Sequence, residues 1–323
     1  MAVPNDPTKL DGFDVIQAPY KSVGDHEIRT DIVVPQGTSN GKRPVILRFH
    51  GGGLAMGDSL FMYFWPRWLS DLALEKGAVV ISPNYRLMPE GSSADSYDDI
   101  DDFWSWVHSP ALTDLLAKHT TPTELDLTRI FTAGDSAGGM LSLYLALAHP
   151  TDIRAASASY PWMTPESELF TPEKVAQPFG VHIPEPVFEE MQSSVTLGTP
   201  MSSAGTQDRL NFLLGLMEYG KMAELYKQGA AAGPRERFYP MAKLEQPGAQ
   251  IPRGGIVVLQ GRHDSVVPLA SVEPWVARAR EVFSEDQISF AVRDGEHEFD
   301  ESIHYEEPWL REVLQKHVEA WLA

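Results

Sequence analysis

Short apolar runs alternate with longer amphipathic segments along the first 160 residues of the chain. The apolar runs predict buried strands, because they are short and bounded by turn residues. The predicted strands are residues 27–34, 44–49, 78–82, 129–133 and 155–160. Helical patterns stand between the later strands, at 98–107 and 136–148. This order is typical of a mostly parallel sheet with helices on both faces.

The helix expected over residues 98–107 carries an acidic run. Its apolar side chains recur at helical spacing and are Ile100, Phe103, Trp104 and Val107. Its acids are Asp98, Asp99, Asp101 and Asp102. We expect these acids in the first turns, where the helix dipole favours negative charge. The run therefore indicates a helix start on a solvated face and not a metal site.

The alternation stops after Pro161 and resumes near Gly255. Beyond that point the pattern predicts strands at 255–260 and 288–292, and helices at 269–283 and from about Tyr305 to the end. The intervening residues, about 164–247, mix Pro, Gly, Met and aromatic residues. We interpret them as a cap inserted into one domain spanning 1–323, with residues 1–27 as a candidate addition to it. Ligands of open α/β sheets bind where the strands end, which is the face that such a cap covers.

The strongest chemical motif is Gly134-Asp135-Ser136-Ala137-Gly138, placed between a predicted strand and a predicted helix. A serine on such a sharp turn presents its hydroxyl above the sheet. The flanking glycines keep Cβ atoms out of the strand–helix crossing. The motif predicts Ser136 as a nucleophile, with the start of the helix favouring developing negative charge.

A second motif, His50-Gly51-Gly52-Gly53, directly follows the predicted strand 44–49. A glycine run there lets backbone N–H groups point at a ligand oxygen. The spacing fits neither a dinucleotide-binding glycine loop nor a phosphate-binding loop. We expect an oxyanion hole formed by the amides of Gly52, Gly53 and Ala137, with Gly51 as a near alternative.

A nucleophilic serine needs a base and an acid, and in this fold the chain order is serine, acid, histidine, with the acid and the histidine on loops after later strands. His297 follows the strand 288–292, and Asp264 follows the strand 255–260. We predict His297 as base and Asp264 as the acid that orients it. His304 and His263 are the alternatives for the base, and Asp294 for the acid. A zinc site of the H-E-x-x-H type fails, because position 301 is Glu.

Composition and net charge restrict the binding partners and the cellular compartment that we expect for this protein. The net charge is −19, so the surface repels nucleic-acid phosphates and anionic membranes. The absence of cysteine excludes disulfides, Cys-ligated zinc and a Cys nucleophile. No apolar run reaches the length of a membrane span, and the N-terminus lacks the features of a signal peptide. We predict a cytoplasmic protein that binds neither nucleic acid nor membrane; the pattern leaves the oligomeric state open.

Four motifs in one order carry a resemblance to a known family. They are HGGG (50–53), YRLMPE (85–90), GDSAGG (134–139) and HEF (297–299). Over about residues 40–160 and 255–320 the chain resembles the hormone-sensitive-lipase-like branch of the α/β-hydrolases. Its sequence is also similar in general character to fungal members of that branch, some of which serve secondary metabolism. The resemblance implies an α/β-hydrolase fold with an eight-stranded, mostly parallel sheet and a helical cap. It also implies a cofactor-free serine carboxylesterase.

The expected reaction is hydrolysis of a small-molecule carboxylic ester through an acyl-enzyme on Ser136. Two other readings stay open: acyl transfer or other non-hydrolytic chemistry in a biosynthetic pathway, and a non-catalytic small-molecule receptor. Several apolar side chains of the cap should line the pocket and favour neutral, apolar substrates. The candidates are Phe170, Phe179, Phe188, Phe212, Leu213, Met217, Tyr219, Tyr226, Phe238 and Tyr239.

Overall fold

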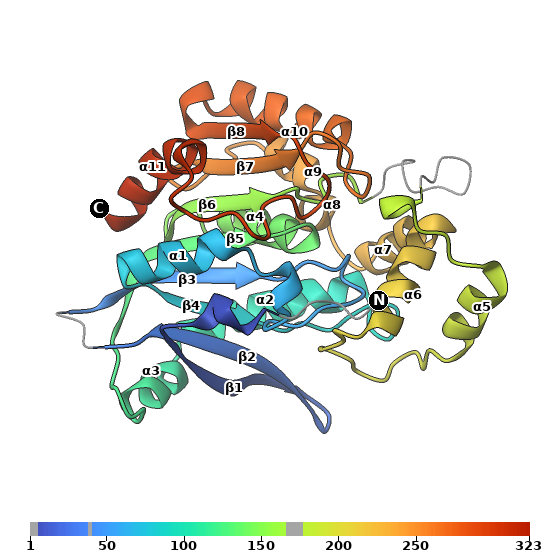
Figure 1. Cartoon of the computed structure of the whole chain (residues 1–323), viewed down its shortest axis with the longest axis horizontal. Coiled ribbons are helices and arrows are strands. Elements are labelled where there is room, and N and C mark those ends of the chain that lie inside the picture. The colour runs from blue at the N-terminus through green and yellow to red at the C-terminus, as the bar shows by residue number, and fades with distance from the viewer. Residues whose placement is uncertain (1–5, 38–40, 166–176) are drawn as a thin grey trace.

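The computed structural model describes residues 6–37, 41–165 and 177–323, in which eight strands form one sheet (Figure 1). The order across the sheet is β1-β2-β4-β3-β5-β6-β7-β8. The first two strands pair antiparallel with each other and β2 pairs antiparallel with β4, whereas all later neighbours are parallel. The bounds are β1 Phe13–Val23, β2 His26–Pro35, β3 Arg43–Phe49, β4 Val79–Pro83, β5 Leu125–Gly134, β6 Ile153–Ser159, β7 Ile256–Gly261 and β8 Ile288–Arg293.

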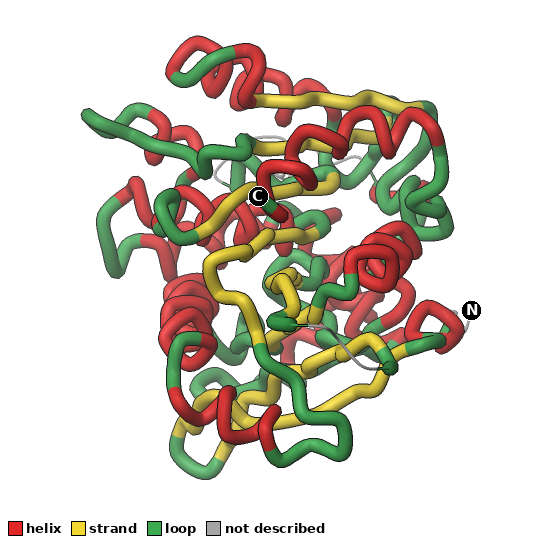
Figure 2. The backbone as a smooth tube through the Cα atoms, turned by 90° about the vertical axis from the view of Figure 1, so that its left-hand side faces the viewer, coloured by secondary structure: helices red, strands yellow, loops and turns green. Residues whose placement is uncertain are grey.

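Helices cover both faces of the sheet (Figure 2). Each face has its own buried hydrophobic core. On one face pack α2 (Ser93–Val107), α4 (Ala137–Ala148) and α10 (Leu269–Val282). On the other face pack α1 (Arg67–Lys76) and α11 (Pro308–Leu322). The predicted α/β class and mostly parallel sheet are thereby confirmed. None of the helices in 6–37, 41–165 and 177–323 has the length and apolar character needed to cross a bilayer.

The sequence pattern located seven of the strands to within a few residues but missed β1 and the helices α1 and α3 (Pro110–Ala117). Alternate side chains of β1 point to solvent, as in a strand that has one face exposed to water. β1 pairs with β2 from Phe13↔Pro35 to Val23↔His26. Residues 13–23 therefore lie in the sheet, and His26, the first residue of β2, contacts a distant segment: its Nε2 lies 2.8 Å from Ser202 Oγ.

The acidic run is not a helix start, which corrects the sequence interpretation. α2 begins earlier, because Ser92 and Asp95 form a reciprocal capping box at its N-terminus. The later acids lie in the middle of the helix, where cations from distant elements meet them. Lys21 Nζ lies 2.7 Å from Asp99 Oδ1, and Arg237 Nη2 lies 2.6 Å from Asp98 Oδ1. The local pattern could not show these partners, since they come from β1 and from the segment beyond β6.

In the described part of the chain, the segment that follows β6 supplies five α-helices, most of which lie at the side where the parallel strands end (Figure 1). They are α5 (Glu185–Ser193), α6 (Gln207–Glu218), α7 (Lys221–Ala230), α8 (Arg235–Phe238) and α9 (Pro240–Leu244). Arg209 ties α6 to the sheet's loops: its guanidinium donates to Ala55 O at 2.6 Å and to Met88 O at 2.7 Å. The same group pairs with Glu90 at 2.6 Å, so α6 is fixed to the loops after β3 and β4.

One buried histidine of the fold predicts a pH-dependent stability. His317 on α11 contacts Gly254 O through Nδ1 at 2.6 Å and Ser289 Oγ through Nε2 at 2.8 Å. Burial lowers the pKa of His317 to about 4, below its usual 6.5. The unfolded chain therefore binds more protons between these values, and the stability is lost as the pH falls from 6.5 toward 4.

We expect His317 to account for a loss of about 2 kcal/mol in the free energy of unfolding between pH 7 and pH 5. Urea unfolding of the parent chain and of His317→Gln at both pH values measures it. The variant should be less stable at pH 7 but lose about 2 kcal/mol less on acidification. Equal losses in the two proteins would contradict the assignment to this side chain.

Candidate active site

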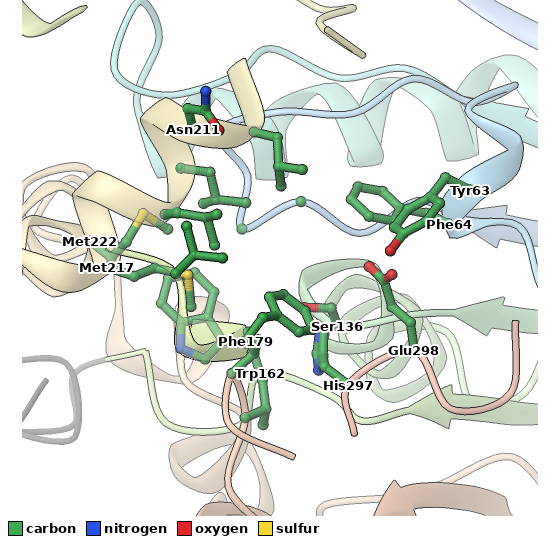
Figure 3. Close-up of a pocket in the computed structure, with 18 of the residues that line it drawn as sticks. Tyr63, Phe64, Ser136, Trp162, Phe179, Asn211, Met217, Met222, His297 and Glu298 are labelled. Carbon is green, nitrogen blue, oxygen red and sulfur yellow. The ribbon is translucent and has the colours of Figure 1, made fainter. Parts of the chain in front are cut away.

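A cavity of about 560 Å³ opens between the carboxyl ends of the strands and the helices α6 and α7 (Figure 3). Its wall is mainly apolar and contains only a few polar side chains. The lining residues are Gly52, Gly53, Tyr63, Phe64, Ser136, Trp162, Phe179, Val181, Gln207, Leu210, Asn211, Leu213, Leu214, Met217, Met222, Val266, Val267, His297 and Glu298. A large apolar cavity with a few convergent polar groups is the usual form of a small-molecule site.

Ser136 stands at the turn between β5 and α4, with φ 55° and ψ −120°. This left-handed φ is unfavourable for a serine, and the surrounding structure enforces it. The Ser136 N–H donates to Ser159 O at 2.9 Å, and the Ser136 carbonyl accepts from Trp162 N at 3.1 Å. The turn is therefore held by backbone bonds, which leaves the hydroxyl to face the cavity.

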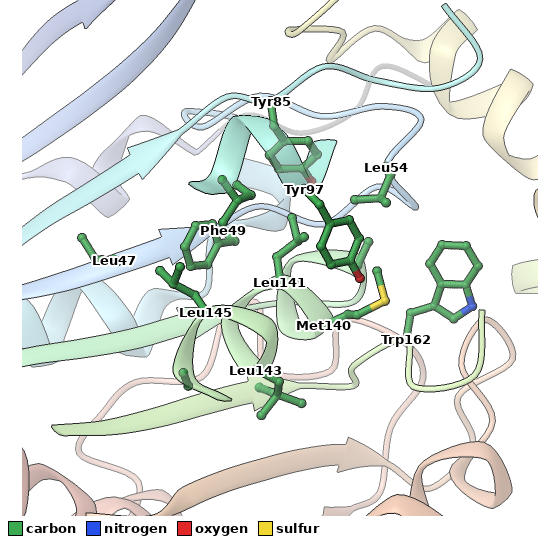
Figure 4. Close-up of a cluster of buried hydrophobic side chains, with 14 of the residues drawn as sticks. Leu47, Phe49, Leu54, Tyr85, Tyr97, Met140, Leu141, Leu143, Leu145 and Trp162 are labelled. Carbon is green, nitrogen blue, oxygen red and sulfur yellow. The ribbon is translucent and has the colours of Figure 1, made fainter. Parts of the chain in front are cut away.

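The glycines on either side of Ser136 allow the strand and helix to cross closely. A Cβ at Gly134 would lie 2.1 Å from Gly138 O, and one at Gly138 would lie 2.1 Å from Phe49 O. Below the turn, α4 is almost wholly buried, mainly against β5 and β6 and also against β3 and α2. Its side chains Met140, Leu141 and Leu145 lie in the core on this face of the sheet (Figure 4). Rigid packing beneath the turn fixes the hydroxyl in position.

The glycine loop after β3 curves over the same place. Gly52 and Gly53 have φ values of 100° and 63°, which favour glycine. The Gly51 N–H donates to Asp135 Oδ2 at 2.7 Å, so it is not available to a ligand. Among the residues that the structure describes, the amides of Gly52, Gly53 and Ala137 have no hydrogen-bond partner. Free amides at these three positions could bind an anionic oxygen.

A buried ion pair supports the glycine loop. Arg48 Nη2 lies 2.8 Å from Asp135 Oδ1, and its guanidinium also donates to Phe64 O at 2.7 Å. Burial raises the pKa of Asp135 to about 6, opposed by Arg48 and by the N–H of Gly51. On the far side, Tyr85 Oη donates to His50 O at 2.7 Å. The sequence motifs did not indicate the Arg48–Asp135 pair, although Asp135 lies inside one of them.

The loops after β7 and β8 bring Asp264 and His297 together. His297 Nδ1 lies 2.9 Å from Asp264 Oδ2, and both side chains are buried. Asp264 Oδ1 accepts from the N–H groups of Val266 and Val267 at 2.9 and 2.7 Å. Gln260 Nε2 donates to Asp264 Oδ2 at 3.1 Å. The carboxylate is therefore held by four donors in one orientation, if His297 Nδ1 carries its proton.

The two loops are also joined directly. His263 N donates to Gly295 O at 2.9 Å, and His297 N donates to Glu296 Oε1 at 2.8 Å. The same Glu296 oxygen accepts from Ser265 N. Sequence reasoning missed Gln260 and Glu296, because a Gln at a strand end and one Glu among several acids carry no pattern of their own.

The alternative bases and acid lie elsewhere. His304 Nδ1 bonds to Asp71 Oδ2 at 2.8 Å on the surface. Asp294 is exposed and pairs with Arg262 at 2.9 Å. His263 is exposed too, and none of the three lines the cavity.

No hydrogen bond joins Ser136 to His297, but both side chains face the same cavity (Figure 3). Hydrogen bonds between a nucleophile and its base are often long before a substrate binds.

Of the ten cap side chains expected at the pocket, Phe179, Leu213 and Met217 line it. Phe170 lies outside the described residues. The other six side chains do not line the cavity and pack against one another or in the interior. Phe188 stacks on Phe212 and Tyr219, and Tyr226 lies against Tyr239, with Phe238 buried nearby. Leu210 and Leu214 of α6 and Met222 of α7 line the pocket as well but were not anticipated.

Comparison with known proteins places the chain in a family. Residues 46–200 match the family described as the alpha/beta hydrolase fold. The probable carboxylesterase M8 of a Phoma species is 30% identical over 302 residues, which cover 90% of this chain and 91% of that protein. A probable carboxylesterase of Cochliobolus lunatus, clz11, is 29% identical over 195 residues, or 59% of this chain and 86% of that protein.

Solved structures share the fold. An esterase of Pyrobaculum calidifontis superposes with a TM-score of 0.59 at 19% identity, covering 98% of this chain and 87% of its own. The esterase LipW of Mycobacterium marinum gives a TM-score of 0.60 at 16% identity, covering 98% and 84%. At such identities the likeness concerns the fold, and the chemistry has to be argued from the site itself.

Proposed function

Because the chain belongs to the hormone-sensitive-lipase-like carboxylesterase family of α/β-hydrolases, we propose that it hydrolyses esters of neutral, apolar small molecules through an acyl-enzyme on Ser136. Family membership makes the chain a hydrolase. The observation that carries the rest is the serine on its strained turn, facing one apolar cavity together with the paired His297 and Asp264.

In the proposed acylation step, His297 Nε2 takes the proton of Ser136 Oγ while that oxygen attacks the acyl carbon. Asp264 holds the Nδ1 proton of the imidazole and stabilises the imidazolium that forms. His297 then gives the proton to the leaving alkoxide, and the alcohol departs. Water repeats the sequence on the acyl-enzyme, with His297 again as the base, and releases the acid.

The negative charge of the tetrahedral intermediate would be bound by the amides of Gly52, Gly53 and Ala137. Their availability supports this role, because the neighbouring Gly51 amide is already engaged by Asp135. The amide of Ala137 opens α4, where the helix dipole adds to the stabilisation. Removing one such donor costs about 10²- to 10³-fold in rate in other enzymes.

The cavity wall supports neutral, apolar substrates. Leu213, Leu214, Met217 and Met222 come from the helices over the strand ends, which we propose act as the cap. Thioether and aliphatic side chains form an adaptable apolar surface. No arginine or lysine lines the cavity in the described residues, so an anionic substituent of a substrate would find no cationic side chain there. The cytoplasmic location and a role in secondary metabolism stay predictions from the sequence.

A substrate panel tests this function. We expect neutral p-nitrophenyl esters of short to medium acyl chains to be hydrolysed, with kcat/KM at least about tenfold above that of a dicarboxylic monoester of equal length, since an unpaired buried charge is costly. Covalent labelling by a fluorophosphonate, located by mass spectrometry, should fall on Ser136. Labelling of another residue, or faster turnover of the anionic ester, would overturn the proposal.

A further inference from the structure

One polar side chain of the cavity takes no part in the mechanism above. Glu298 directly follows His297, and its carboxyl group lines the cavity (Figure 3). In the part of the chain that the structure describes, this carboxyl group has no hydrogen-bond or ion-pair partner. Buried acids nearby are bound: Asp135 by Arg48, and Asp300 by Trp68 and Ser159. Glu298 is half-buried at the cavity wall, so its carboxyl group is free to bind a ligand there.

The backbone of Glu298 adds a second observation. Its φ is 64°, in the left-handed region where glycine is favoured and a side chain is strained. The local fold alone would be better served by glycine. A strained residue that also presents an unpaired carboxyl group to a cavity points to a role in binding.

A phenol group faces the same part of the cavity. Tyr63 belongs to the short helix η2 (Met62–Phe64), and its hydroxyl has no hydrogen bond within the described residues. In Figure 3, Tyr63 and Glu298 lie on one side of Ser136, and Met217, Met222 and Asn211 lie on the other. The cavity is thus divided into a largely apolar part beside α6 and a part with two hydrogen-bonding groups, Tyr63 and Glu298.

A buried lysine holds the two groups in place. Lys9 is 2% exposed, and its ammonium donates to Met62 O at 2.8 Å and pairs with Glu301. Met62 precedes Tyr63, and the N–H of Glu301 donates to Glu298 O at 3.0 Å. Lys9 therefore clamps η2 against the loop that carries Glu298, which keeps both polar groups preorganised around one point.

We propose that Glu298 and Tyr63 form a polar subsite that donates hydrogen bonds to a neutral oxygen of the substrate, an ether, hydroxyl or carbonyl oxygen lying beyond the ester group. The inference rests on the proposed ester hydrolysis and refines its substrate class. The substrate is an ester with an apolar part, which packs against α6 and α7, and an oxygen-bearing part on the opposite side of Ser136.

The electrostatic surroundings favour donation by both groups. Burial, together with the negative charges of Asp135, Asp300 and Glu301, raises the pKa of Glu298 well above its usual range. Burial, with Glu298 and Glu301, likewise raises the pKa of Tyr63. Both shifts favour the protonated forms, and a protonated carboxyl group donates a hydrogen bond whereas a carboxylate only accepts.

Matched esters that differ by one oxygen test the subsite. One pair is 2-methoxyethyl hexanoate and butyl hexanoate; the other is hexyl 4-methoxybutanoate and hexyl hexanoate, which moves the oxygen to the acyl side. The measured quantity is the ratio of kcat/KM for the methoxy ester to that for its methylene analogue. In at least one pair, Glu298→Met should lower this ratio about 3- to 10-fold, the discrimination given by one hydrogen bond.

Three further variants make the test specific. Glu298→Gln still donates through its amide and should keep most of the ratio. Tyr63→Phe should lower it, while Glu306→Met, at an exposed carboxylate outside the cavity, should leave it unchanged.

A choline ester of hexanoic acid tests whether the subsite binds cations instead. If the parent chain prefers this ester to the methoxy ester and Glu298→Gln loses that preference, the carboxyl group binds cations and the proposal is wrong.

Binding to Ser136→Ala separates this subsite from the reaction. The ratio of dissociation constants for each pair, followed by the fluorescence of Trp162 in the cavity, should change by the same factor in Ser136→Ala/Glu298→Met. If this binding ratio changes but the parent chain hydrolyses neither ester, the subsite stands and the proposed function fails. If hydrolysis occurs but Glu298→Met leaves both ratios unchanged in both pairs, the subsite is overturned and the function stands.

Discussion

Replacing Ser136 with Ala should lower kcat for p-nitrophenyl butyrate by about 10⁴- to 10⁶-fold, because no other group would form the acyl-enzyme. Some turnover above the uncatalysed rate should remain, since the amides of Gly52, Gly53 and Ala137 would still bind the oxyanion. The assay is the initial rate of p-nitrophenol release. Fluorophosphonate labelling of the variant should be lost at the same time.

The fold of the Ser136→Ala variant should survive. The Ser136 hydroxyl makes no hydrogen bond in the described residues, and the strained turn is held by main-chain bonds from Ser159 and Trp162. The melting temperature should therefore stay within about 1.5 degrees of that of the parent chain, a margin worth about 1 kcal/mol for this chain length. As a control, Ser105→Ala on the exposed side of α2 should keep full activity. A variant at 136 that folds and keeps a tenth of the activity would disprove the assignment.

Replacing Asp264 with Asn should lower kcat by about 10⁴-fold, through the tautomer of His297. The N–H groups of Val266 and Val267 both bond to Oδ1, so an asparagine must place its carbonyl oxygen there. Its NH₂ then faces His297 Nδ1 and donates to it. The imidazole proton is forced onto Nε2, and that nitrogen can no longer accept the serine proton.

The control for this prediction is the acid that the sequence left as an alternative. Asp294→Asn removes an exposed carboxylate whose only described partner is Arg262, and it should change kcat by less than about twofold, as an exposed ion pair contributes little. The pair of variants is compared by steady-state kinetics at one pH. A loss of less than tenfold in Asp264→Asn, or a large loss in Asp294→Asn, would require another acid.

Most of the sheet could be predicted from the sequence, because buried parallel strands are short continuous apolar runs that need no partner to be recognised. The run Pro44–Phe49 and the strand Ile256–Gly261 are examples. The β1 strand was missed because it lies at the sheet edge with one face in solvent. The beginning of α2 was misplaced because the acids at 98–102 resemble a first turn, whereas the capping box at Ser92 starts the helix.

Some features of the candidate site depend on residues close together in the sequence, and others depend on residues far apart in it. The sequence itself determined the turn at Ser136 and the glycine loop after β3, since both conformations depend on glycines at fixed offsets within a few residues. It also narrowed the base and the acid to a few residues, because chain order in this fold restricts them to loops after two late strands. Local chemistry thus fixes which groups can react.

Only the tertiary structure decided which of those groups meet and what surrounds them. The contact between Asp264 and His297, the clamp of Lys9 between η2 and the loop of Glu298, and the inward face of α6 all join residues far apart in the chain. No periodicity encodes such contacts, because each depends on the packing of whole elements and on the loss of water around the groups. The same surroundings raise the pKa of Glu298 and leave its carboxyl group without a partner in the described residues, a property that the motif HEF does not reveal.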